Sequence, residues 1–73
     1  MQFHDDDLLI EITPLGDWQR VAVLHVGSRT EVVVHGPLAA SSEYLIALGR
    51  RKLARRLARA AARAGAAEPG LWV

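Results

Sequence analysis

Residues 41 to 64 form one uninterrupted stretch with the signals of a long α-helix. Either Ser41 or Ser42 can cap its start, because a serine hydroxyl accepts hydrogen bonds from the free N–H groups of a first helical turn. Gly65 suits the position just past a helix end, and Pro69 follows it. A helix of about 23 residues measures roughly 34 Å. It is therefore long enough to cross a whole small β-sheet.

The predicted helix has two faces when successive residues are placed ~100° apart. The apolar face carries Ile46, Leu53 and Leu57, and beyond them only alanine. The opposite face carries six basic side chains: Arg51, Lys52, Arg55, Arg56, Arg59 and Arg63. This pattern is typical of an amphipathic helix and is not specific for any one ligand.

The first two turns of the helix depart from this pattern. Leu45 and Leu48 project into the sector that becomes basic further along, which predicts a second apolar patch that contacts another subunit. Gly49 lies where the two patterns meet, although glycine costs about 1 kcal/mol relative to alanine inside a helix. Close backbone approach or a bend in the helix would explain it.

The residues before the helix predict three short strands. Residues 8–13, 18–26 and 30–35 are rich in β-branched and apolar side chains, and turn residues separate them. Short turns imply antiparallel hairpins. The predicted fold class is α+β, with a three-stranded antiparallel β-meander followed by one long C-terminal amphipathic helix.

All 73 residues fit one domain. We divide it into an acidic N-terminal segment at 1–7, the meander at 8–36, the helix at 41–64 and a tail at 66–73.

Both faces of the predicted sheet are apolar at their centre, and one helix can cover only one of them. The simplest cover for the other face is a second copy of the chain, so we predict a homo-oligomer, with a dimer favoured. The candidate contact residues are Val21, Val23, Val32, Val34, Leu45 and Leu48. The alternative is that the tail residues 71–73 fold back over the second face.

Charge is unevenly distributed along the chain. Residues 1–43 hold two arginines and seven acids, whereas residues 44–73 hold seven bases and one acid. The basic helix face could therefore bind an acidic protein or nucleic acid, the latter without sequence specificity because base-reading Asn and Gln are missing from the helix. The alternative is a solvated face that is partly paired with acids of the sheet.

Several function classes have no support in the sequence. The chain has no cysteine, no glycine-rich phosphate loop and no nucleophile motif, so we predict neither catalysis nor a cofactor nor a small-molecule substrate. Residues 4–7 have metal-ligand types but no defined geometry, and no metal site is predicted. The apolar runs are too short for a membrane span, and the acidic start is unlike a signal peptide. We therefore predict a cytoplasmic protein that does not bind membranes.

Three motifs resemble a known group of proteins. They are the strand and Gly-Pro turn of residues 30–37, the pair Ala40-Ser41, and Arg51-Lys52-Leu53 in the helix. Together they resemble a group of short uncharacterised bacterial proteins, a domain of unknown function, over roughly residues 8–60. The chain departs from that group in a shorter turn at 27–29 and in its alanine-rich end. The resemblance implies this fold and implies no activity.

Overall fold

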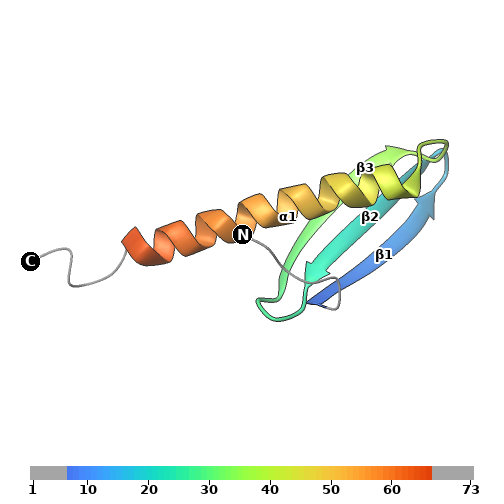
Figure 1. Ribbon diagram of the computed structural model, residues 1–73. Helices are drawn as coiled ribbons and strands as arrows, with labels where there is room; N and C mark the ends of the chain where they lie inside the picture. The colour runs from blue at the N-terminus through green and yellow to red at the C-terminus, as the bar shows by residue number, and fades with distance from the viewer. Residues whose placement is uncertain (1–6, 67–73) are drawn as a thin grey trace, which may run out of the picture.

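The computed structural model describes residues 7–66, with side chains described through residue 64. Three strands come first: β1 (Leu8–Leu15), β2 (Trp18–His25) and β3 (Thr30–Pro37). They form one antiparallel sheet in the order β1-β2-β3, and the helix α1 (Ser42–Ala66) follows. Figure 1 shows α1 lying on one face of the sheet. The predicted α+β meander and helix are confirmed.

The two hairpin turns each hold one residue at a positive φ, and in only one of them is that residue glycine. Gly16 and Asp17 connect β1 to β2, and Gly16 takes a φ of 62°, which glycine adopts without strain. The β2–β3 turn places Arg29 at a φ of 56°. We predicted that Pro14 would end the first strand, but β1 continues to Leu15. A proline is tolerated there because β1 is an edge strand and its missing N–H faces away from β2.

The strand register places two rows of side chains against the helix. Val21 lies opposite Val34, and Val23 lies opposite Val32. Because side chains alternate along a strand, these four valines share one face. The helix packs mainly on β2 and β3, and the buried core consists of Leu8, Val21, Val23, Val32, Leu45, Leu53 and Leu57.

Glycine allows the helix to approach this face closely. A Cβ atom added at Gly49 would lie 2.7 Å from Cγ2 of Val23, which is fully buried. The helix backbone at Gly49 therefore does approach the sheet closely, and the atoms that it meets belong to valine side chains. A Cβ added at Gly36 would likewise lie 2.7 Å from Cδ2 of Leu45.

The start of the helix is fixed by two polar side chains. Ser41 Oγ accepts a hydrogen bond from the backbone N–H of Tyr44 at 3.3 Å, so Ser41 is the cap. Gln19 on β2 is buried, and its Nε2 donates to the backbone carbonyls of Pro37 and Ala40, both at 3.0 Å. This amide joins the middle strand to the connection that leads into α1.

The C-terminal part of the helix extends beyond the sheet. Leu57 is buried, whereas every side chain from Ala58 to Ala64 is exposed. Figure 1 shows this part of α1 extending past the strands. Although α1 has 25 residues, no helix in the described part of the chain is apolar enough over sufficient length to cross a bilayer.

Candidate interaction surfaces

The structure corrects the surface that we predicted for self-association. Val21, Val23, Val32 and Leu45 are buried in the core, and Val34 and Leu48 are partly buried against it. All six belong to the layer between the sheet and its own helix. The assignment of Val21, Val23, Val32 and Leu45 to a free face is therefore wrong, because these four side chains are buried against the chain's own helix. Val34 and Leu48 stay partly exposed, at the side of the layer that borders β3 and the basic helix face.

The error has a simple physical origin. The two faces of β2 carry similar numbers of apolar residues, so the sequence alone does not say which face receives the helix. The deciding features are Gly49 and Gly36, which admit the valines and Leu45 at short distance. Leu45 lies between the helix and the sheet. Of the basic side chains, Lys52 and Arg56 lie beside this layer, next to β3.

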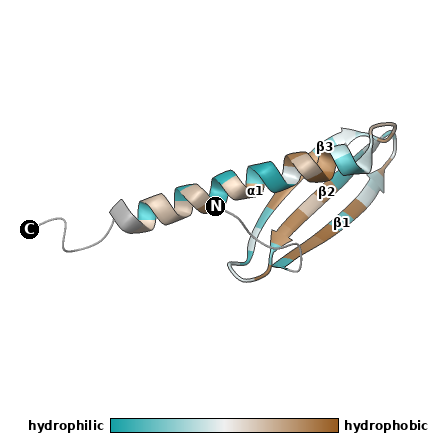
Figure 2. Cartoon of the chain, in the orientation of Figure 1, coloured by the Kyte–Doolittle hydropathy of each residue, from teal (hydrophilic) through white to brown (hydrophobic). Residues whose placement is uncertain are grey.

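The first strand is the part of the sheet that the helix leaves uncovered. Ile10 and Ile12 lie on the same face as the core valines, yet they are 41% and 43% exposed. Leu9 and Leu15 on the same strand are also exposed. Figure 2 shows the apolar stretch of β1 at the side of the sheet. We had not named these residues as candidates, although the first strand of a meander is always an edge and this one is almost continuously apolar.

Among residues 7–66, no strand pairs with the outer side of the β1 backbone. The N–H of Val26 donates to the carbonyl of Asp7 at 2.9 Å, which fixes the alternation of the ladder. Leu9, Glu11 and Thr13 therefore direct their backbone groups toward β2. Leu8, Ile10 and Ile12 direct theirs outward, where a further strand could pair with them.

The opposite edge of the sheet is closed by the helix. Lys52 Nζ donates to the carbonyl of Val33 at 3.1 Å, and Arg56 Nη1 donates to the carbonyl of Glu31 at 2.8 Å. These two carbonyls point outward from β3, because the alternate residues Val32 and Val34 face β2. Two of the six predicted basic side chains thus occupy the outer edge of β3.

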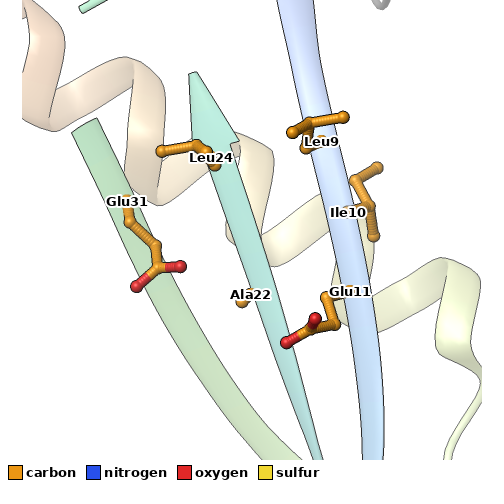
Figure 3. Close-up of a pocket in the computed structure, with 6 residues that line it drawn as sticks. All are labelled: Leu9, Ile10, Glu11, Ala22, Leu24 and Glu31. Carbon is orange, nitrogen blue, oxygen red and sulfur yellow. The ribbon is translucent and has the colours of Figure 1, made fainter. Parts of the chain in front are cut away.

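The face of the sheet opposite the helix holds a shallow hollow, shown in Figure 3. Ala22 lies at its centre, with Leu9 and Leu24 at one end and the carboxylates of Glu11 and Glu31 on either side. Arg20 Nη1 lies 4.0 Å from Oε1 of Glu11, a distance at the limit of an ion pair. This face combines a small apolar centre with acidic groups.

The basic face of α1 is exposed along its whole length. The side chains of Arg51, Lys52, Arg55, Arg56, Arg59 and Arg63 are all exposed, and within residues 7–64 none of them forms an ion pair with an acid. The expected pairing with acids of the sheet is absent for these six side chains in this range. A groove between β3 and α1 brings Lys52, Arg55 and Arg59 together with His35 and Leu48.

Other sequence hypotheses fall partly outside the described residues. The hypothesis that residues 71–73 cover the sheet lies outside the described residues. So do residues 4–6 of the segment with metal-ligand types. Within residues 7–64, no three His, Asp or Glu side chains come together in a group that could hold a metal ion.

Comparison with known proteins identifies one family. A family model for a domain of unknown function matches residues 5–60, more than half of the chain. The match spans all three strands and the helix as far as Ala60, and leaves the alanine-rich end outside. The resemblance to a family of unknown function is thereby confirmed. No curated protein and no solved structure matches the chain.

Proposed function

We propose that this chain, which belongs to the DUF6898 family of unknown function, is a non-catalytic interaction module that self-associates through the β1 side of its sheet. One observation carries the proposal: Ile10 and Ile12 lie on the core face of the sheet but are not covered by the helix. Self-association remains the function predicted from the sequence, on a surface that differs from the predicted one.

Size supports this proposal. A 73-residue chain buries only about 60% of its unfolded surface, so covering further apolar area has a large effect on its stability. Among the residues whose side chains the structure describes, half of the exposed large apolar residues lie on β1: Ile10 and Ile12 on the helix face of the sheet, and Leu9 and Leu15 on the other face. Such a concentration on one edge strand is typical of a surface that is covered in the assembled protein.

Sedimentation velocity from about 1 to 100 μM tests the proposal. We expect the wild-type chain to be a dimer at the upper end of this range, and Ile12→Lys to be a monomer with unchanged far-UV circular dichroism. Leu38→Lys is the matched control, because Leu38 is 50% exposed on the loop before the helix and lies outside the β1 surface. A wild-type monomer at all concentrations would refute self-association, and a dimeric Ile12→Lys variant would refute this site.

A second candidate function follows from the basic helix face. Six exposed basic side chains without acidic partners in the described residues favour binding to the phosphate backbone of a nucleic acid. Fluorescence anisotropy with generic duplex DNA and RNA should show binding that weakens steeply with salt. Arg55→Glu with Arg59→Glu should abolish it, whereas Arg20→Glu on the sheet should not. No binding at low salt would end this candidate.

A further inference from the structure

We propose that two copies join by pairing their β1 strands edge to edge, which makes one six-stranded antiparallel sheet with Ile10 on the two-fold axis. This inference rests on the proposed self-association and specifies its geometry. Its basis is the contrast between the two edges: β1 offers free backbone groups and uncovered isoleucines, and β3 is closed by Lys52 and Arg56.

The register follows from the side chains of β1. The outward backbone groups form hydrogen bonds only in registers that place Leu8, Ile10 and Ile12 of one copy opposite residues of this same outward set in the other. With Ile10 opposite Ile10 of the second copy, Ile12 lies opposite Leu8, and about six backbone hydrogen bonds form. The isoleucines and Leu8 then form one continuous apolar row on the face that carries the helices. On the other face, Leu9 lies beside Glu11 of the second copy.

Neighbouring registers each meet a defect. An axis at Glu11 places two carboxylates directly opposite each other, which is destabilising. An axis at Leu9 places Glu11 opposite Asp7 of the second copy, with the same result. An axis at Ile12 pairs Ile10 with Pro14, which has no N–H to donate.

The two-fold axis of such a pair is perpendicular to the sheet, so both helices lie on the same face. Both outer edges of the six-stranded sheet are then β3 strands, whose carbonyls at Glu31 and Val33 already accept hydrogen bonds from Arg56 and Lys52. Lysine and arginine over an edge strand hinder further strand pairing. The helix therefore limits the assembly to two copies.

Disulfide trapping tests the register, because the chain has no cysteine of its own. Directly opposite residues in a hydrogen-bonded antiparallel pair have Cα atoms about 5.5 Å apart, within reach of a disulfide. Ile10→Cys should therefore form a covalent dimer within minutes to hours in oxidised glutathione. Leu9→Cys is the matched control: it is 60% exposed on the same strand, but its two copies lie about 8 Å apart and should stay largely unlinked.

The outcomes separate this inference from the proposed function. A dimer that links through Leu9→Cys would overturn the register with Ile10 on the axis. A dimer that links through neither cysteine would overturn the edge-to-edge geometry, and both results would leave self-association intact. A wild-type monomer would overturn both.

The closed edge of β3 is tested separately. Lys52→Ala with Arg56→Ala should shift the sedimentation coefficient to species larger than a dimer, because the carbonyls of Val33 and Glu31 lose their donors. Arg51→Ala with Arg55→Ala removes the same charge from the same helix, where no such backbone contact is made, and should remain dimeric. Equal behaviour of the two double variants would show that Lys52 and Arg56 do not close the edge.

Discussion

Gly49 shows how one missing methyl group determines where the helix lies. Replacing a helical glycine by alanine ordinarily stabilises a helix by about 1 kcal/mol. Here the new Cβ would lie 2.7 Å from Cγ2 of Val23, a stiff and fully buried side chain. Overpacking of this kind costs about 1 to 3 kcal/mol.

We therefore expect Gly49→Ala to lower the free energy of unfolding by about 1 kcal/mol net, measured by urea denaturation. The control is the same substitution in a Val23→Ala background, where the methyl group has room and should be stabilising. A more stable Gly49→Ala variant of the wild-type chain would contradict the close approach.

Gln19 presents a different kind of constraint, because it is a polar side chain in an otherwise apolar layer. Its amide donates to the carbonyls of Pro37 and Ala40, just before the helix begins. Gln19→Met keeps the length of the side chain and removes the donor. Since the carbonyls it leaves are partly buried, we expect a loss of about 1 to 3 kcal/mol in the same denaturation experiment. An unchanged midpoint would show that water replaces the amide at no cost.

At this scale, sequence reasoning was partly successful. It identified Ser41 as a possible cap, because capping is a local requirement of a helix start. It identified a close approach at Gly49, because glycine is otherwise unfavourable inside a helix. It placed Leu45 in the basic sector, whereas that residue is buried against Gly36. The orientation of a helix about its own axis depends on the surface against which it packs. The residue pattern of the helix alone carries no information about that surface.

The helix as an element has two parts with different support. Up to Leu57 it is held by buried leucines, and from Ala58 to Ala64 its side chains are exposed. Alanine favours the helical state but buries little area. Native-state amide exchange should therefore be at least tenfold faster in residues 59–64 than in residues 49–56.

A variant sharpens this test of the helix. Leu57→Ala removes the last buried side chain and should extend fast exchange toward Leu53. Uniform protection along α1 in the wild-type chain would show that something else supports the projecting end.

The strands were predicted to within a few residues, because β-branched runs and Gly-containing turns are strong local signals. The first and third strands were predicted to end at residues 13 and 35, two residues too early. We expected Pro14 and Gly36 to break the strands, but each is tolerated in the ladder because of its position. Pro14 lies on an outer edge, and Gly36 lies opposite Gln19 beneath Leu45.

For the molecule as a whole, the sequence predicted the order of the elements. It did not predict which face and which edge of the sheet the helix covers. Connections are short, so the meander and the helix can combine in few ways. Which face and which edge stay open depends on where the helix lies across the strands. That position is set by packing between residues far apart in the sequence, such as Gly49 and Val23.

The proposed self-association would have a thermodynamic consequence that can be measured without a structural probe. If unfolding is coupled to dissociation, the midpoint temperature rises with protein concentration. We expect an increase of roughly 3 to 6 °C for each tenfold rise in concentration of the wild-type chain. Ile12→Lys should have a midpoint that does not change with concentration. A concentration-independent midpoint for both proteins would argue for a monomer.

The arrangement of charge would give the proposed dimer an electric dipole normal to the sheet. Glu11 and Glu31 lie on the face away from the helix, where Arg20 is the nearby basic residue, and six basic side chains belong to the helical layer. When two copies are related by an axis normal to the sheet, their electric dipoles add along that axis and cancel across it. A chain whose net charge is only +1 would thus form a plate with one strongly basic side and one side of mixed charge. Such a plate would turn its helices toward any negatively charged surface before touching it.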